Sequence, residues 1–280
     1  MRNTWLTAFL LSCLTLSLHS QGLRDSLKGH EGSIYRIKPS VDIPVEAGSA
    51  AWCVYGFAQI GKKESTSLAE LQQLTTHDIG WLDRWSVHPY SRSVDQISYI
   101  PFFVAMPLPL AVFGIDNKMR KDFWKLTFLY GEAMTLTGVL YTSAVHYVNR
   151  HRPLVYESAS PLETRQSANS RNSFFAGHVA LVATSVFFIA RTYADYHPES
   201  PYKWAFYGGA AAITELTAFW RSQAGEHFFS DILIGNAVGI ASGLLTPVLH
   251  RHSGTSHKYK VSVLPFSSQG AGMTALVRLP

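Results

Sequence analysis

Five long stretches of mainly apolar residues occupy the middle of the chain, at residues 96–114, 124–146, 174–193, 204–220 and 228–249. Each approaches the roughly 20 residues that an α-helix needs to cross a lipid bilayer. Aromatic residues mark several of their ends, as they do where a membrane meets water. The pattern predicts an all-α fold, a transmembrane multi-helix bundle with about five to six spans.

Prolines and acidic residues interrupt these apolar stretches. Pro101, Pro107 and Pro109 are expected to bend the first stretch. Glu132 and Glu215 lie inside two others. An ionisable residue at membrane depth is a functional candidate, although a structural partner within the bundle explains both glutamates more simply.

The N-terminus has the pattern of a secretory leader. Arg2 supplies a positive start, an apolar run follows at residues 5–18, and cleavage before Gln21 is plausible. The alternative is a membrane anchor that is not cleaved. We predict a signal peptide at residues 1–20 and an exported mature protein.

Residues 21–95 are predicted to be an exported N-terminal segment with interfacial helices. The apolar run at residues 47–60 is short for a membrane span, so we interpret it as re-entrant or interfacial. Residues 68–85 combine leucines at helical spacing with charges, and end in tryptophans. That pattern is typical of a helix on a membrane surface, or alternatively of a surface helix in a globular domain.

Residues 250–280 are predicted to be a polar linker and a short C-terminal β-hairpin tail, which leaves residues 96–249 as the helical bundle. Residues 259–264 and 273–279 alternate like two strands around a segment rich in turn residues. His250, His252 and His257 lie in the linker. We expect them to belong to a solvated tail rather than to a metal site.

The composition agrees with a membrane protein and argues against nucleic acid as a partner. Charged residues make up 15% of the chain, compared with ~25% in typical soluble domains. The net charge is +5, yet no basic run or basic–aromatic pattern is long enough for a nucleic-acid surface. Cys13 lies in the leader, so the mature chain keeps Cys53 alone and has no internal disulfide.

Residues 220–235 contain the first group of candidate catalytic side chains. Asp231 follows His227 by four positions, which on a helix puts both on one face. The carboxylate could then fix the imidazole tautomer and leave the other ring nitrogen free to act. Arg221 offers a planar fork of donors that matches phosphate oxygens. Two interpretations follow: phosphoryl chemistry with a histidine nucleophile, or a helix-capping histidine beside a solvated arginine.

Two further groups lie at the ends of the apolar stretches that flank the loop at residues 146–173. Arg152 follows one stretch, and Gly177-His178 begins the next. Asn172 or Ser173 is expected to cap this second helix, whose first amides would form an anion site. His178 would then be placed to give a proton to a leaving group.

In order and spacing, these groups resemble the motifs of the type 2 phosphatidic acid phosphatase superfamily, which includes lipid phosphatases, soluble bacterial acid phosphatases and vanadium haloperoxidases. That family's pattern is Lys, six residues and Arg-Pro, then Pro-Ser-Gly-His, then Ser-Arg, five residues, His, three residues and Asp. The apolar segments between the motifs are most similar to those of bacterial membrane members, including lipid A phosphatases. The resemblance covers residues 145–235, and the matching residues are Arg152, Pro153, Gly177, His178, Arg221, His227 and Asp231.

The chain departs from that pattern at several positions. The departures are Val145 for the lysine, Phe175 and Ala176 for the proline and serine, and Trp220 for the serine before the second arginine. His146, Arg150 or His151 could supply a replacement cation. Losing one preorganised donor typically costs ~100- to 1000-fold in rate. We therefore expect weakened rather than abolished catalysis.

The resemblance implies a membrane-bound phosphatase that hydrolyses a phosphate monoester or pyrophosphate on a lipid through a phosphohistidine intermediate. The lipid would be lipid A-like, undecaprenyl pyrophosphate or of the phosphatidate type. No metal or other cofactor is expected, because the arginines would repel a cation. The implied roles are nucleophile for His227, its orienting partner for Asp231, acid and base for His178, and phosphate binding for Arg152, Arg221 and the Gly177 amide.

The charged loops predict an orientation. Lys118, Arg120 and Lys121 argue that the loop at residues 115–123 is cytoplasmic. The loops at residues 146–173 and 221–227 then face outward, which predicts a multi-pass protein of a bacterial inner membrane with its active site facing the periplasm. The arginines of the loop at residues 146–173 oppose this orientation unless they bind phosphate.

Two other functions remain open. The first is a soluble exported non-specific acid phosphatase, which would not need detergent. The second is a catalytically impaired phospholipid-binding pseudoenzyme, which would keep the arginines without turnover. The apolar stretches argue against a haloperoxidase.

Overall fold

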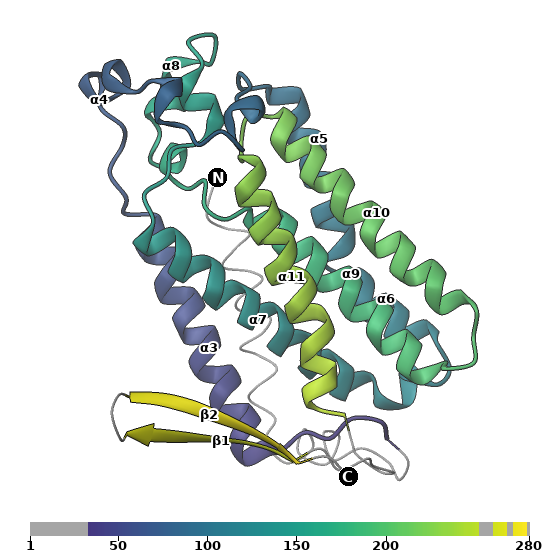
Figure 1. The fold of residues 1–280 in the computed structure, drawn as a ribbon. Coiled ribbons are helices and arrows are strands. Elements are labelled where there is room, and N and C mark those ends of the chain that lie inside the picture. The colour runs from purple at the N-terminus through teal and green to yellow at the C-terminus, as the bar shows by residue number, and fades with distance from the viewer. Residues whose placement is uncertain (1–32, 252–259, 268–270, 279–280) are drawn as a thin grey trace.

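The computed structural model describes residues 33–251, 260–267 and 271–278, so the predicted signal peptide lies outside the described residues. The described chain is an elongated bundle of helices (Figure 1). Its longer helices are α3 (Pro39–Ile60), α5 (Arg92–Ala105), α6 (Leu108–Ile115), α7 (Phe123–Tyr147), α9 (Gly177–Tyr196), α10 (Tyr202–Gln223) and α11 (Phe229–Leu249). The all-α prediction is confirmed for the bundle.

The central helix of the bundle is α9, which packs against α5, α7, α10 and α11. Val179, Val182, Phe188 and Ile189 are among its buried residues, and they cover more than one face of the helix. A helix that is apolar all round belongs in a core rather than on a surface. The other long helices therefore surround α9.

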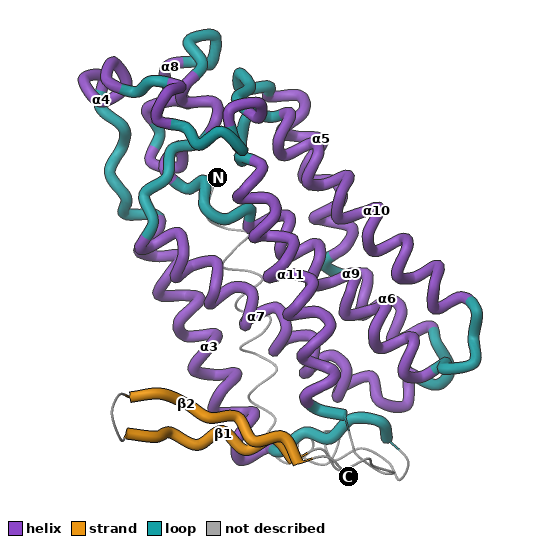
Figure 2. Tube along the Cα trace, viewed as in Figure 1, coloured by secondary structure: helices purple, strands orange, loops and turns teal. Residues whose placement is uncertain are grey.

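Short elements connect the long helices (Figure 2). Two strands, β1 (Lys260–Ser267) and β2 (Ala271–Arg278), pair antiparallel. The short helices are α4 (Leu68–Gln73), α8 (Leu162–Gln166) and 3₁₀ turns at Thr76–Asp78, Arg84–Ser86, Met119–Asp122, Pro153–Tyr156 and Ala168–Arg171. α4 and α8 lie at the end of the bundle that is uppermost in Figure 1. We call this the upper end, and the opposite end the lower end.

Three segments among the described residues are long and apolar enough to cross a membrane: Arg92–Ile115, Gly177–Tyr196 and Phe229–Leu249. The first of them combines α5 and α6, which are separated at Met106 and Pro107 as the prolines predict. α7 and α10, with 25 and 22 residues, are long enough but are not among these three segments. The predicted count of five to six spans stays a prediction.

Two segments of the N-terminal part differ from expectation. The apolar run at residues 47–60 belongs to α3, a helix of 22 residues that packs along α7, and not to a separate re-entrant element. Residues 68–85 do not form one surface helix. They break after α4 because Thr75 and Asp78 form a capping box that starts a new 3₁₀ turn.

Small residues allow α11 to lie directly against α9. Gly235, Gly239 and Gly243 recur every four residues and therefore share one face of α11. An added Cβ at Gly239 would lie 2.2 Å from the carbonyl oxygen of Ala180 in α9. Close backbone approach through glycines at this spacing is a common way to pack helices in membranes.

We expect Gly239→Val to destabilise the bundle. The valine would meet backbone of α9, which cannot move as a flexible side chain can, and overpacking of this kind costs about 1–3 kcal/mol. Thermal unfolding of the purified protein in detergent measures the effect. Gly208→Val is the matched control, since nothing lies within 4 Å of a Cβ at Gly208. Equal melting temperatures for the two variants would contradict this packing.

The linker after α11 does not begin as a solvated tail. The side chain of His250 is only 17% exposed, and its carbonyl accepts a hydrogen bond from the Arg36 backbone amide at 2.8 Å. The expectation was wrong for this histidine because the chain before α3 covers the end of α11. His252 and His257 lie outside the described residues.

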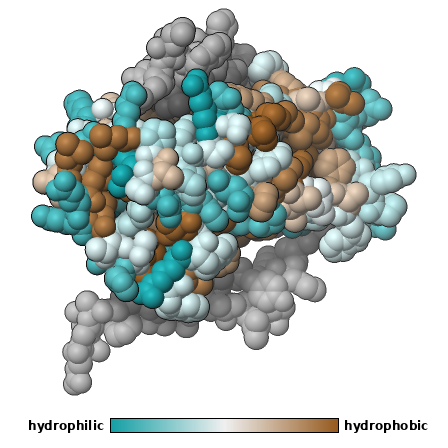
Figure 3. Space-filling view, turned by 90° about the horizontal axis from the view of Figure 1, so that it is seen from above, coloured by the Kyte–Doolittle hydropathy of each residue, from teal (hydrophilic) through white to brown (hydrophobic). Residues whose placement is uncertain are grey.

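Exposed aromatic side chains occur near both ends of the bundle. Figure 3 looks onto the upper end and shows hydrophobic patches among hydrophilic residues. Such belts are typical of the two interfaces of a membrane protein. The exposed aromatics include Trp81, Trp85 and Tyr147 near the upper end, and Trp124, Tyr202 and Trp204 near the lower end.

Candidate active site

The predicted site residues lie together at the upper end of the bundle. α9 and α11 begin at this end and α10 ends there, so residues distant in sequence become neighbours. The Ala176 amide donates to the Asp231 carbonyl at 3.1 Å and fixes the start of α9 to the start of α11. The charges of Arg152 and Arg221 act on the imidazoles of both His178 and His227.

His227 is held with one ring nitrogen free. Its side chain is buried, and Nδ1 lies 2.8 Å from the carbonyl oxygen of Ser173. A carbonyl can only accept, so Nδ1 carries the proton and Nε2 keeps the lone pair. Burial, followed by the charges of Arg152 and Arg221, holds the pKa of His227 well below its usual value of 6.5. The imidazole is therefore neutral at neutral pH and able to act as a nucleophile.

Asp231 does not contact His227 as the spacing predicted. His227 precedes the N-cap of α11, so the two residues do not share a helical face. The Asp231 carboxylate instead accepts from Ser173 Oγ at 2.5 Å and from the Phe228 amide at 3.0 Å, and it pairs with Arg150. Ser173 links the two groups, because its side chain binds Asp231 while its carbonyl holds His227.

Arg152 and Arg221 converge on a residue that the sequence analysis did not single out. Both guanidinium groups contact the buried carboxylate of Glu226, and Arg221 donates to its Oε2 at 2.9 Å. Charged groups buried without a partner are costly, and Glu226 supplies the missing negative charge. Its place directly before His227 in the third motif was the signal that could have identified it.

Other polar groups fix the two arginines in position. Arg221 donates to Asp95 at 2.6 Å and to Ser98 at 3.0 Å, and its guanidinium lies 5.4 Å from the centre of the Tyr99 ring. Arg152 donates to the side chain of Asn169 at 3.2 Å. The buried Nε atoms of both arginines have no hydrogen-bond partner among the described residues. These donors remain available to an anion.

His178 lies in the first turn of α9, in an aromatic setting. Its ring lies edge-on to Tyr99 and Phe102, with centroids 4.8 and 5.1 Å away. Gly177 begins the helix, and a Cβ there would lie 2.5 Å from the Tyr141 ring, so a larger residue would have to displace that ring. The first amides of a helix have no partner within it and attract anions.

The expected cap of α9 is absent in the structure. The N-cap is Ala176, which makes no side-chain bond to the helix. Ser173 bonds to Asp231 instead, and Asn172 lies close to Arg152 through its carbonyl at 3.4 Å. The first amides of α9 are therefore left without a side-chain cap.

Arg150 and His151, two of the residues proposed to replace the lysine, pair with carboxylates other than Glu226. Val145 is fully buried. Arg150 pairs with Asp83 at 2.6 Å and with Asp231, so it fixes α11 to the preceding chain. His151 Nε2 lies 3.1 Å from a carboxylate oxygen of Glu70. Asp83 was missed because it is 148 positions before Asp231, and only the folded chain brings them together.

The arrangement suits an anion with several oxygens. Two guanidinium groups and uncapped helix amides can bind phosphate oxygens, while an oriented neutral imidazole lies beside them. Among the described residues, the one cluster with metal-ligand geometry is Asp42, Glu132 and His250, which is separate from this site.

Comparison with known proteins gives two findings. Residues 126–254 match a family model described as the PAP2 superfamily, and this range contains all the predicted site residues. The chain is also similar to a solved structure, the crystal structure of Aquifex aeolicus LpxE, with 21% identity, a TM-score of 0.42, and coverage of 62% of this chain and 98% of that one. No curated protein sequence matches the chain.

Proposed function

We propose that the chain is a membrane-bound lipid phosphatase of the PAP2 superfamily that acts through a phosphohistidine, a proposal supported by the match of residues 126–254 to the model of that family. The substrate class is a phosphate monoester or pyrophosphate on a lipid, either lipid A-like, undecaprenyl pyrophosphate or of the phosphatidate type. The active site faces the periplasm from a bacterial inner membrane. The positive charges of Lys118, Arg120 and Lys121 favour a cytoplasmic position for their loop, which supports this orientation.

One observation carries the proposal: two buried arginines hold a carboxylate immediately before a histidine whose Nε2 is free. A carboxylate and a phosphoryl group use the same donors of an arginine fork. The position now taken by Glu226 is therefore where a phosphate would find its ligands. A neutral histidine beside that position already has the lone pair that attacks phosphorus, so it needs no separate base.

The proposed reaction has two steps. His227 Nε2 attacks phosphorus in line and the bond to the lipid oxygen breaks. His178, which can take up a proton once the bound phosphate offsets the charges of Arg152 and Arg221, gives that proton to the lipid oxygen. A water molecule then attacks the phosphohistidine, His178 takes the water proton, and the nitrogen–phosphorus bond breaks to release phosphate. Arg152, Arg221 and the Gly177 amide balance the charge on the phosphoryl oxygens in both steps.

The surroundings support a lipid rather than a soluble ester. The three apolar helical segments end or begin at the site. Trp81 and Trp85, exposed by 81% and 59%, lie near the same end and would anchor it at the headgroup level. A phosphate attached to a membrane lipid is found at this depth.

A binding protein without turnover is the second candidate. Glu226 occupies the arginines, and Val145 stands where the resemblance expects a lysine. Both features favour retention of a phosphate site with weakened chemistry. Turnover distinguishes the two functions.

The test is phosphate release by the purified protein in detergent. The panel contains a lipid A-like phosphate, undecaprenyl pyrophosphate, phosphatidylglycerophosphate and phosphatidate, with p-nitrophenyl phosphate as the soluble comparison. We expect release from at least one lipid at a higher kcat/KM than from the soluble ester. Vesicle binding with no release from any member of the panel would favour the binding protein. Preference for the soluble ester, by a protein that needs no detergent, would favour an acid phosphatase.

The pH dependence follows from the environment of His227. Because its pKa is held well below 6.5, the nucleophile stays neutral as the pH falls through 6.5. The acid limb of kcat/KM that belongs to His227 should therefore lie below that pH. In Arg152→Gln a positive charge is removed, so the pKa of His227 should rise and the acid limb should move to higher pH. A limb that does not move, or moves to lower pH, would contradict this electrostatic effect.

A further inference from the structure

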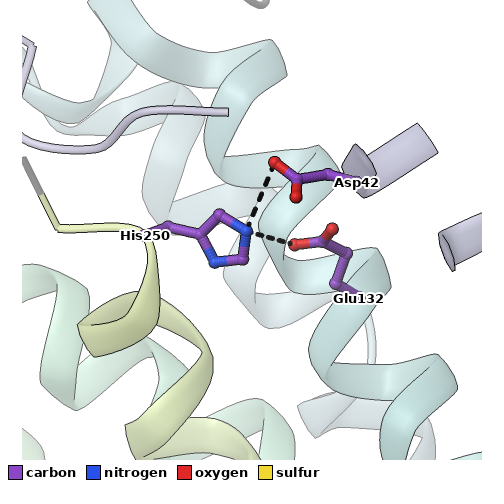
Figure 4. Close-up of side chains that lie close together, drawn as sticks. All are labelled: Asp42, Glu132 and His250. Carbon is purple, nitrogen blue, oxygen red and sulfur yellow. Dashed lines mark ion pairs between the residues drawn. The ribbon is translucent and has the colours of Figure 1, made fainter. Parts of the chain in front are cut away.

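We propose that Asp42, Glu132 and His250 bind a divalent transition-metal ion at the lower end of the bundle, far along the helices from His227. Figure 4 shows the three side chains pointing toward one another. Asp42 comes from α3, Glu132 from α7, and His250 follows the last residue of α11. A bound ion would therefore tie three helices together.

The distances fit ligands of one ion. His250 Nε2 lies 3.3 Å from Glu132 Oε2 and 3.6 Å from Asp42 Oδ2, and all three ligand atoms lie within 4.8 Å of one another. Two atoms bound at about 2.1 Å to one tetrahedral zinc ion are roughly 3.4 Å apart. The spacing is longer than a good hydrogen bond to a ring nitrogen and close to that of neighbouring ligands.

The tautomer of His250 points to a cation. Nδ1 lies 3.0 Å from the Thr246 carbonyl, which can only accept, so Nδ1 is the protonated nitrogen. In the neutral ring, Nε2 then directs a lone pair at two carboxylates. A histidine that ligates a metal commonly donates its other N–H to a backbone carbonyl in this way.

The carboxylates also lack sufficient positive charge. Glu132 Oε2 is buried and has no hydrogen-bond partner among the described residues. Asp42 accepts from the Lys38 amide at 2.5 Å. Glu46, one turn after Asp42, adds another carboxylate that bonds Thr135 of α7. In the described part of the chain, no lysine or arginine side chain pairs with Asp42, Glu132 or Glu46.

One imidazole and two carboxylates select a particular class of ion. Imidazole favours zinc and neighbouring transition metals over Mg²⁺, which prefers oxygen and water. Three protein ligands leave one position for water at a tetrahedral ion. The role we assign is structural, because the ligands join separate helices and belong to none of the groups around His227.

The experiment is thermal unfolding of the full chain in detergent after treatment with EDTA, with and without Zn²⁺. We expect Zn²⁺ to raise the melting temperature by about 5 °C at saturation, since a ligand that binds only the folded state stabilises it. Glu132→Gln and Asp42→Asn should lose most of this shift. Co²⁺ in place of Zn²⁺ should give a visible absorption band in the wild-type protein alone.

Asp116→Asn is the matched control. It removes the carboxylate of a single histidine–aspartate pair, Asp116 and His197 at 2.9 Å, also at the lower end. This variant should keep the full response to Zn²⁺. An unchanged melting temperature in wild type overturns the proposal, as does an equal shift in Glu132→Gln. If Glu132→Gln lowers the melting temperature by the same amount with EDTA and with Zn²⁺, His250 is an imidazolium paired with two carboxylates and the proposal is wrong.

Discussion

Replacing His227 with glutamine should lower kcat for phosphate release by about 10⁴-fold or more, the scale of losing a covalent nucleophile. The glutamine amide can still donate to the Ser173 carbonyl, which His227 Nδ1 holds at 2.8 Å. The fold of the site is thereby kept while the attacking nitrogen is removed. His227→Ala should lose as much activity but also some stability, since the buried carbonyl is left unpaired. Steady-state phosphate release and a melting curve measure both effects.

Acid quenching adds a direct readout for the covalent step. Wild-type protein quenched during turnover should carry acid-labile phosphate on nitrogen, and His227→Gln should carry none. His151→Ala is the control, because this histidine lies at the same end and bonds Glu70 instead. Turnover at the wild-type rate in His227→Gln would exclude this mechanism.

Much of the site could be predicted from the sequence because its geometry is encoded in short motifs. A helix start brings Gly177 and His178 to the upper end, and the end of α10 brings Arg221 back to it. The apolar segments between them are long enough to cross the bundle and return. The order and spacing of these groups, together with the family resemblance, therefore predicted which distant residues would lie at one end of the bundle.

The partners within the site could not be predicted in the same way. The four-residue spacing of His227 and Asp231 predicted a direct hydrogen bond on one face of a helix. Because α11 begins at Phe229, His227 lies outside the helix and the two residues do not share a face. The actual link runs through Ser173, whose main chain and side chain serve different partners. Hydrogen bonds between distant loops follow from the packed backbone, which local spacing does not contain.

The contacts of Glu132 and His250 at the lower end could not be predicted for the same reason. Glu132 was expected to have a structural partner in the bundle, and the structure brings it close to Asp42 and His250. The sequence places His250 in a polar stretch with two other histidines, which predicts a solvated linker. Only the chain before α3, which lies against the end of α11, shows that this histidine is covered.

Glu226→Gln should strengthen phosphate binding and weaken the free protein. The carboxylate competes with phosphate for Arg152 and Arg221, which both contact it. Without that competitor, the inhibition constant for inorganic phosphate should fall about ten- to a hundredfold, a fraction of the Coulomb attraction at such distances. Without any anion, two buried arginines lose a partner, and breaking a buried pair costs about 3–5 kcal/mol. A lower melting temperature should therefore be restored by added phosphate.

Competition by Glu226 therefore predicts two effects together in Glu226→Gln: tighter phosphate binding and lower stability without phosphate. A merely structural glutamate would lower the melting temperature in Glu226→Gln without tightening phosphate binding, and added phosphate would not restore it. Glu163→Gln is the control, because Glu163 is exposed in α8 and should change neither quantity. Competition between Glu226 and phosphate would also mean that the carboxylate must leave the arginines at each turnover. It would then limit how tightly the product is held and help to release phosphate once the phosphohistidine has been hydrolysed.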